Sequence, residues 1–326
     1  MNDTAGEDWS FWALPLGAML DAVLGDPRTW PHPVRAIGRL IATTERALRR
    51  GLARSRGGPR AERIAGVVLV LVVLGLTGLA AWGVVTGGDR LGGLGSLLGR
   101  GLLVYWGLAA RSLGDEALRA SEAADLETAR RELSMIVGRD TATLDRPAIY
   151  RACVETVAEN CNDAVVAPLF WFVVGGPVGL WAYKAVNTLD SMVGYRDERY
   201  RHLGWASARL DDAAGLIPAR LTWLLIALAA AFRNEHAAAA LRIGWRDGRK
   251  HPSPNAAWGE AAMAGALQVE LGGPSTYGRL IRFKPTLGDP GAPIGPAIVR
   301  RAVGVLWVAS GLAAFLAWIA RACIVA

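Results

Sequence analysis

Two long runs without a charged side chain constrain this chain more than any other feature. Residues 64–86 contain 23 uncharged positions, and residues 302–320 form a second run, flanked by Arg300, Arg301 and Arg321. A helix of this length crosses the roughly 30 Å of hydrocarbon in a bilayer. We therefore predict that both runs are membrane-spanning helices.

Weaker apolar segments lie between these runs and at the N-terminus. Residues 91–113 form a third expected span, although one arginine interrupts it, and the spacing Gly95-x-x-x-Gly99 within it allows a neighbouring helix to approach closely. Residues 9–24 and 213–232 are expected to be further membrane segments.

One central segment combines an apolar composition with residues that break helices. Residues 164–183 are uncharged but contain Pro168 and the triplet Gly175-Gly176-Pro177. Backbone that leaves the helix at membrane depth is tolerated where it lines a cavity inside the protein. We therefore predict that this segment is broken or re-entrant and does not simply cross the membrane.

Arginine-rich loops set the expected orientation. Residues 25–63 contain ten arginines and three acidic side chains, which is typical of a cytoplasmic loop. Because no stretch alternates well enough to predict a strand, residues 1–326 are expected to form one membrane-embedded, all-α, polytopic bundle with cytoplasmic helical loops. The segments assigned to the cytoplasm are 25–63, 114–163, 184–212 and 233–299.

The composition agrees with apolar spans that alternate with polar loops. The chain is 52% hydrophobic and 20% charged, whereas a soluble domain is rarely so apolar and a simple channel is rarely so charged. Its net charge of +7 favours an anionic lipid surface and acidic substrates over nucleic acid.

Three carboxylates recur at one-turn spacing in a predicted helix before the broken segment. Glu155, Glu159 and Asp163 stack on one face, where like charges destabilise a helix by roughly a few tenths of a kcal/mol per pair. Mg²⁺ would relieve this repulsion, since it is often held by one or two carboxylates together with substrate phosphates. The alternative is a solvated helix face. We take Glu159, Asp163 and the later Asp212 as candidate Mg²⁺ ligands.

Two further polar groups adjoin apolar runs. Charges at the membrane interface are costly and usually functional, and arginine can hold phosphate or carboxylate through two parallel hydrogen bonds. The alternatives are a polar helix surface and, for Asp212, a helix cap. The residues concerned are Lys184, Asn187 and Asp190 in the first group, and Arg209, Asp211, Asp212 and Arg220 in the second.

Two His-Pro turns lie far apart in the sequence. We predict that His32 and Arg35 converge with His251 and Asn255 on one cavity, and that Glu260 lies beside it. The alternative is that both turns only shape loops. The tetrapeptide Leu-Gly-Asp-Pro, which occurs at positions 24–27 and 287–290, is interpreted as a coincidence.

The common nucleotide and hydrolase motifs are missing from the sequence. It contains no Walker A loop, Rossmann glycine pattern, HExxH or GxSxG motif. Any ATP must therefore bind at a site outside these motifs.

Six long strings resemble one family in the same order along the chain. LGDPRTWPHPVRAIGRLI, SMIVGRDTATLD, VETVAENCNDAVVAPLF, YKAVNTLDSMVGY, GWASARLDDAAGLIPARLT and HPSPNAAWGEAAMAGALQVELGG are similar to the CobD/CbiB family, the adenosylcobinamide-phosphate synthases of cobalamin biosynthesis. The resemblance runs from about residue 16 to about residue 280.

The resemblance implies a multi-pass enzyme of the cell inner membrane with its active site facing the cytoplasm. It implies an ATP-dependent, carbon–nitrogen bond-forming ligase that joins adenosylcobyric acid to (R)-1-aminopropan-2-ol or its O-phosphate. Mg²⁺ and ATP are the expected cofactor and co-substrate, and other late corrinoid enzymes are candidate partners.

Two other classes of protein stay open at this point. One is a membrane sensor or scaffold of the AmpE-like type without catalysis, and the other is a transporter with broken helices. For the ligase, the expected catalytic residues are Glu159, Asp163, Lys184, Asp190, Asp211 and Asp212. The expected substrate-binding residues are His32, Arg35, Asn160, Asn187, Arg209, Arg220, His251, Asn255 and Glu260.

Overall fold

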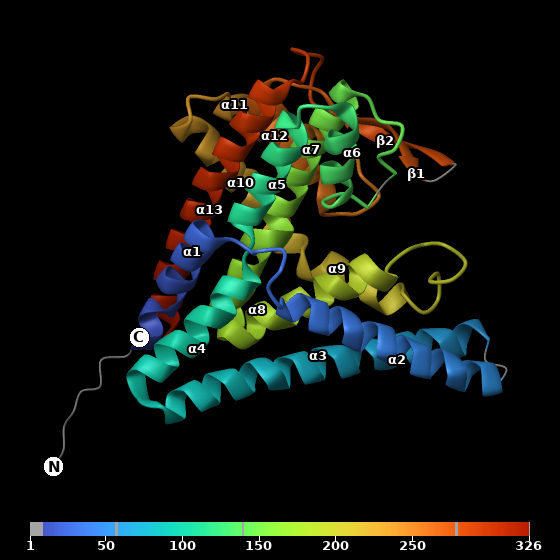
Figure 1. The fold of residues 1–326 in the computed structure, drawn as a ribbon, viewed down its shortest axis with the longest axis vertical. Coiled ribbons are helices and arrows are strands. Elements are labelled where there is room, and N and C mark those ends of the chain that lie inside the picture. The colour runs from blue at the N-terminus through green and yellow to red at the C-terminus, as the bar shows by residue number, and fades with distance from the viewer. Residues whose placement is uncertain (1–8, 56–57, 139, 278–279, 326) are drawn as a thin grey trace. The chain divides into compact units, whose positions relative to one another are not determined.

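The computed structural model describes residues 9–55, 58–138, 140–277 and 280–325, and most of them are helical (Figure 1). The chain divides into two compact units. Unit 1 consists of Met1–Leu108, Pro168–Ala214 and Leu316–Ala326, and unit 2 consists of Ala109–Ala167 and Gly215–Phe315.

Unit 1 combines apolar helices with one strongly basic helix. Helix α3 exposes an apolar stripe in which Ile64, Leu71 and Trp82 are each more than half exposed, as expected of a surface in contact with lipid. The elements of this unit are η1 (Trp9–Trp12), α1 (Ala13–Leu24), the arginine-rich α2 (Pro33–Ser55), α3 (Pro59–Arg90), α4 (Gly92–Gly107), α8 (Ala167–Val193, from Pro168), α9 (Trp205–Ala214) and the end of α13 (Pro296–Val325).

Glycine lets the helices of unit 1 touch backbone to backbone. Helices α3 and α4 form an antiparallel hairpin, in which a Cβ on Gly88 would lie 2.6 Å from the carbonyl oxygen of Gly95. A Cβ on Gly99 would lie 3.3 Å from the carbonyl oxygen of Val84. The close contact predicted from Gly95 and Gly99 is therefore confirmed, and a side chain at Gly88 would force the two backbones apart.

Helix α8 is broken where the sequence predicts it. Gly175 and Gly176 leave the helical conformation, and Gly176 has a φ of 61°, which favours glycine. A Cβ on Gly179 would overlap the carbonyl oxygen of Trp171, although positions eight apart in a straight helix are separated by about 12 Å along the axis. The chain therefore bends so sharply that the two halves of α8 touch. Re-entry from one side of the membrane stays a prediction.

Unit 2 is built around a helix that is buried on all sides. Every residue of α12 (Ala256–Leu267) from Ala257 onward is buried. Its glycines admit the neighbouring backbones, because a Cβ on Gly259 would lie 2.6 Å from the carbonyl oxygen of Ala158. The other elements are α5 (Ala110–Glu122), α6 (Leu126–Ser134), α7 (Arg146–Cys161), a π-helical turn (Asn162–Val166), α10 (Leu216–Phe232), α11 (Ala237–Asp247), β1 (Leu271–Tyr277), β2 (Leu280–Leu287) and most of α13.

The prediction that the chain contains no strand is wrong in one place. Strands β1 and β2 pair antiparallel, with Leu271 opposite Leu287, inside the segment predicted as a helical loop. Glycine and proline interrupt the alternation of both strands and hide it. The hairpin is instead fixed by a tertiary contact, because the backbone N–H of Gly272 donates to Oε1 of Glu155 on α7 at 2.9 Å.

Long apolar helices include the two uncharged runs of the sequence. By length and composition, three helical stretches can cross a membrane, and the bent pair of α9 and α10 can supply a fourth span. The fold class of an all-α polytopic membrane protein is therefore confirmed. The three stretches are Pro59–Arg90, Arg146–Val193 and Pro296–Ile324.

Two of the smaller expected segments differ in detail. Trp9–Leu24 is a shorter apolar helix. The segment 91–113 is divided at Leu108 and Ala109 between α4 and α5, so that no single described helix covers it.

The touching halves of α8 generate a test of the fold. Gly179→Ala should destabilise the protein by about 2 kcal/mol, because its methyl group would overlap the backbone of Trp171. Gly175→Ala is the matched control, since a Cβ there meets nothing within 4 Å and its φ of −130° is open to alanine. Thermal unfolding in detergent measures both variants. Equal melting temperatures for the two would show that the halves do not touch.

Candidate active site

The side chains predicted to carry the chemistry fall into two groups, one in each compact unit. Several of them are half-buried, which allows a ligand to reach groups that the fold holds in place. Unit 2 contains Glu159, Asn160, Asp163, Arg220, His251, Asn255 and Glu260. Unit 1 contains His32, Arg35, Lys184, Asn187, Asp190, Arg209, Asp211 and Asp212.

Helix α7 and the π-helical turn that follows it carry the three predicted carboxylates of unit 2. Its N-terminus is capped by Asp145, whose side chain accepts from the backbone N–H of Ala148 at 2.9 Å. Glu155 is 4% exposed and holds the β-hairpin, whereas Glu159 and Asp163 are half-buried. The first carboxylate of the row therefore has a structural role, and the other two are the candidates for ligand binding.

The helix changes type at the third carboxylate. Asn162–Val166 form a π-helical turn, a feature that often occurs at functional sites. The hydroxyl of Thr222 on α10 donates to Oδ1 of Asn162 at 3.0 Å, and Nδ2 of Asn162 donates to Oδ1 of Asp163 at 2.6 Å. Two helices thus orient the Asp163 carboxylate through a pair of hydrogen bonds.

Arg220 lies one turn into α10 and is fixed on an indole ring. Its guanidinium carbon lies 4.6 Å from the centre of the Trp258 ring, and Nη1 donates to the carbonyl of Leu216 at 2.8 Å and to Oδ1 of Asn255 at 3.1 Å. A guanidinium has five N–H donors. Within the part of the chain that the structure describes, Nε and Nη2 form no hydrogen bond, so their donors are available for an anion.

The second His-Pro turn supports this arginine. The backbone N–H of Ser253 donates to Nδ1 of His251 at 3.0 Å, and the backbone N–H of Asn255 donates to the hydroxyl of Ser253 at 3.3 Å. The turn thereby holds Asn255, which is 9% exposed, against Arg220. The structure thus brings Arg220 and Asn255 together, and it places Glu260 in the buried helix α12.

The second half of α8 carries the polar group of unit 1. Lys184, Asn187 and Asp190 are half-buried on this helix. The hydroxyl of Thr188 donates to the carbonyl of Lys184 at 2.6 Å and is used within the helix. A Cβ at Gly194 would overlap the Asp190 carboxylate, so glycine is required there. On α9, Asp211 and Asp212 are half-buried and Arg209 is exposed.

The first His-Pro turn is organised locally. Nδ1 of His32 accepts from the backbone N–H of Val34 at 3.2 Å, and its Nε2 lies 3.5 Å from the Asp26 carboxylate. Nη2 of Arg35 donates to the carbonyl of Arg28 at 3.0 Å. Because the two His-Pro turns belong to different units, their predicted meeting stays a prediction.

The predicted Mg²⁺ ligands are likewise divided between the two units. Glu159 and Asp163 belong to unit 2 and Asp212 to unit 1. Across the described ranges of the chain, no group of three or more His, Cys, Asp or Glu side chains could hold a metal ion. Two carboxylates fit an ion that enters with substrate phosphates, because Mg²⁺ usually keeps several waters and few protein ligands.

Comparison with known proteins now decides the family. A sequence model described as CobD/Cbib protein matches residues 14–306. The chain belongs to the CobD/CbiB family.

Relatives within this family are similar over almost their full length. The cobalamin biosynthesis protein CobD of Geobacter metallireducens is 50% identical over 302 residues, which cover 92% of this chain and 93% of that protein. CobD of Klebsiella pneumoniae is 50% identical over 298 residues, which cover 90% and 92%. CbiB of Salmonella typhi is 47% identical over 306 residues, which cover 93% and 95%. No solved structure matches the chain.

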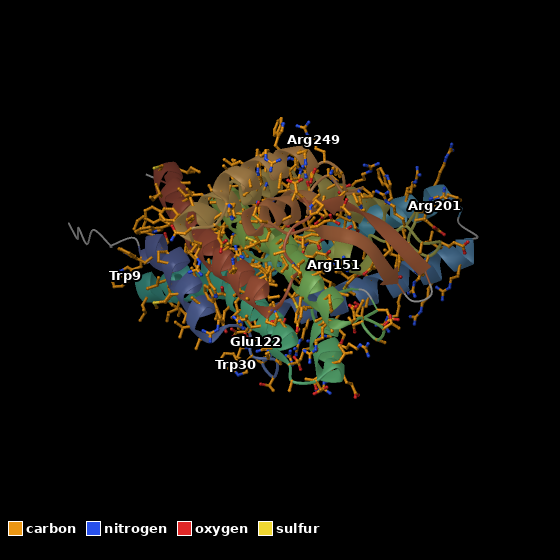
Figure 2. All side chains as sticks on the ribbon, turned by 90° about the horizontal axis from the view of Figure 1, so that it is seen from above. Trp9, Trp30, Glu122, Arg151, Arg201 and Arg249 are labelled. Carbon is orange, nitrogen blue, oxygen red and sulfur yellow. The ribbon has the colours of Figure 1, made fainter. Side chains whose placement is uncertain are left out.

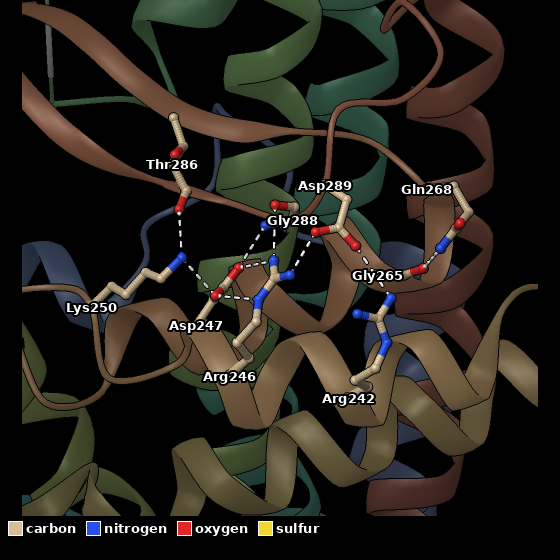
Figure 3. Close-up of polar contacts among 9 residues, drawn as sticks. All are labelled: Arg242, Arg246, Asp247, Lys250, Gly265, Gln268, Thr286, Gly288 and Asp289. Atoms are coloured by element: carbon tan, nitrogen blue, oxygen red, sulfur yellow. Dashed lines mark hydrogen bonds and ion pairs between the residues drawn. The ribbon is translucent and has the colours of Figure 1, made fainter.

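This CobD/CbiB chain also contains an ion-pair network that the sequence did not predict. Asp247 ends α11 and is fully buried. Arg246 donates to both of its carboxylate oxygens at 2.7 Å, Nζ of Lys250 lies 2.7 Å from Oδ1, and the backbone N–H of Gly288 donates to Oδ2 at 2.9 Å (Figure 3). A buried carboxylate with so many donors fixes the backbone around it.

The same network binds the second Leu-Gly-Asp-Pro, residues 287–290, to α11. Asp289 lies 2.6 Å from Nη1 of Arg246 and 3.2 Å from Nη2 of Arg242 (Figure 3). Gly288 and Gly25, the glycines of the two tetrapeptides, both adopt positive φ values, 95° and 59°. The two tetrapeptides follow different elements, a helix and a strand, so their interpretation as a coincidence stays a prediction.

Hydrogen bonds together outweigh burial in setting the pKa of the Asp247 carboxyl group. Burial alone would raise the pKa of its carboxyl group, but the hydrogen bonds from Arg246, Lys250 and the Gly288 backbone outweigh burial and lower this pKa to about 2. The ionised carboxylate therefore stabilises the fold above the unfolded value of 3.8. This stabilisation is lost as the pH falls from about 4 toward 2.

Asp247→Asn should destabilise the protein by about 3 kcal/mol, since it leaves two cations beside a buried neutral group. It should also flatten the loss of stability between about pH 4 and pH 2. Chemical unfolding in detergent at several pH values measures both effects. The control is Asp289→Asn, at a half-exposed carboxylate, which should cost less than about 1 kcal/mol. Equal losses in the two variants would contradict the assigned role of burial.

Proposed function

We propose that this chain is an ATP-dependent amide ligase that joins adenosylcobyric acid to (R)-1-aminopropan-2-ol or its O-phosphate. The relatives are named cobalamin biosynthesis proteins, which supports the coarser role of an enzyme in that biosynthesis. The substrates, the use of ATP and the reaction sequence are the finer parts of the proposal.

Two oriented side chains in unit 2 support this chemistry most directly. The Asp163 carboxylate is oriented from α10 through Thr222 and Asn162, and Arg220 of the same helix is fixed on Trp258. Oriented carboxylates and a cation with available donors are the groups that phosphoryl transfer requires. A sensor would not need this combination.

The reaction is proposed to proceed in two balanced steps. An oxygen of the corrinoid carboxylate attacks the γ-phosphorus of ATP, the bond to the β-phosphate oxygen breaks, and ADP leaves. The amine nitrogen then attacks the acyl carbon of the acyl phosphate, inorganic phosphate leaves, and the proton from nitrogen passes to a carboxylate base. The sum is an amide, ADP and phosphate from an acid, an amine and ATP.

Residues of both units are assigned to these steps. Glu159 and Asp163 would hold Mg²⁺, with Asp212 as a further candidate, and the ion neutralises phosphate charge when bound. The candidate to stabilise the charge on the transferred group is Arg220 in unit 2 or Lys184 in unit 1. Asp190 or Asp211 would take the proton from the amine. The neighbouring amides and arginine, Asn160, Asn187 and Arg209, bind substrate, as do His32, Arg35, His251, Asn255 and Glu260.

The proposed enzyme lies in the inner membrane with its site open to the cytoplasm. ATP is cytoplasmic, and the ten arginines of residues 25–63 favour the same side. The long apolar helices support a multi-pass arrangement.

The test is product formation by the full chain in detergent. With ATP, Mg²⁺, adenosylcobyric acid and either amine, one ADP should form for each amide. Glu159→Gln and Asp163→Asn should each lower kcat by roughly 100-fold or more, with unchanged membrane insertion. Glu127→Gln, at an exposed position of α6, is the control and should keep full activity.

Two outcomes would contradict the proposal. Near-normal activity in both variants would make the carboxylate row structural. No amide with either amine would remove the ligase function and favour the sensor or the transporter.

A further inference from the structure

The loop after α11 contains a second arginine that lies against the same indole as Arg220. The guanidinium carbon of Arg249 lies 4.6 Å from the centre of the Trp245 ring and 5.9 Å from the centre of the Trp258 ring. That of Arg220 lies 4.6 Å from the centre of the same Trp258 ring. Two cations from different segments of unit 2 are thus held beside one aromatic side chain.

These two arginines differ from their neighbours in how their charges are balanced. Arg246 and Lys250 pair with the buried Asp247, and Arg242 pairs with Asp289. Among the described residues, neither Arg220 nor Arg249 forms an ion pair, and the two positive charges repel each other. An anion between them would remove this repulsion.

The platform beneath the two guanidiniums is rigid. Nε1 of Trp258 donates to the carbonyl of Pro254 at 3.1 Å, and its ring packs against Trp223 and Trp245 at centroid distances of 5.4 and 6.4 Å. A Cβ on Gly248 would lie 2.7 Å from the Trp258 ring, so the backbone before Arg249 is pressed against it. The arginines are therefore positioned before any ligand arrives.

The outer guanidinium faces solvent. Arg249 is exposed, and Figure 2 shows its side chain pointing away from the ribbon. Arg220 is half-buried, and no described residue accepts from its Nε or Nη2. A small anion can thus reach Arg249 from solvent, and two cations beside one indole favour a phosphate group over a lone carboxylate.

We propose that Arg249, together with Arg220 and Trp258, forms a phosphate-binding clamp. The identity of its ligand rests on the proposed function, in which the phosphate belongs either to ATP or to the amine phosphate. Arg249 holds and orients this group, and the aromatic contacts keep its side chain in place.

Equilibrium dialysis of the full chain in detergent with radiolabelled inorganic phosphate tests the clamp without requiring turnover. Arg249→Gln should weaken phosphate binding roughly tenfold or more, and Arg249→Lys should weaken it less. Arg242→Gln is the matched control, because Arg242 is an exposed arginine of the adjoining helix whose charge is balanced by Asp289. It should bind phosphate like the parent protein.

Steady-state kinetics separate the two sources of phosphate. A raised KM for ATP alone in Arg249→Gln assigns the clamp to the nucleotide, and a raised KM for the amine phosphate alone assigns it to that substrate. The parent chain could also bind phosphate, lose that binding in Arg249→Gln, and yet form no amide. This result would support the clamp and contradict the ligase function. Unchanged binding in Arg249→Gln, an equal loss in Arg242→Gln, or no binding by the parent chain would overturn the proposal.

Discussion

Close approach of backbones at glycine is the constraint on which the rest of this structure depends. Apolar helices gain little from burial against one another in lipid, so packing distance decides how well they associate. In unit 1, Gly88 and Gly99 bring α3 and α4 together, and Gly179 admits the other half of α8. In unit 2, Gly259 admits the backbone of α7. A single added methyl group at Gly88, Gly179 or Gly259 would force the touching backbones apart.

The polar groups of unit 2 depend on that frame. Because α12 packs directly on α7, Thr222 of α10 can reach Asn162, and Asn162 can orient Asp163. Trp258, on the buried helix α12, carries Arg220 on its ring. Groups that would be costly in an apolar setting are thus held by hydrogen bonds and aromatic faces.

Local features could be predicted from the sequence, and contacts between distant segments could not. The break in α8 follows from Gly175, Gly176 and Pro177 alone, since these residues disfavour a helix wherever they stand. The β-hairpin escaped prediction because a contact with Glu155, more than a hundred positions earlier, fixes it. The sequence around Asp247 could not show that this acid is buried, because burial is a property of the folded chain. In the candidate site, too, local spacing could be predicted and contacts between distant segments could not. Glu155 and Glu159 share one spacing, yet the fold ties the first to a backbone amide and leaves the second half-buried.

The transfer of oxygen during the reaction tests the central claim most directly. The corrinoid carboxylate is labelled with ¹⁸O, and the full chain is supplied with ATP, Mg²⁺ and amine. An acyl phosphate requires that one labelled oxygen pass to inorganic phosphate for each amide formed. Labelled oxygen in AMP, or amide formation with no label in phosphate, would contradict the account.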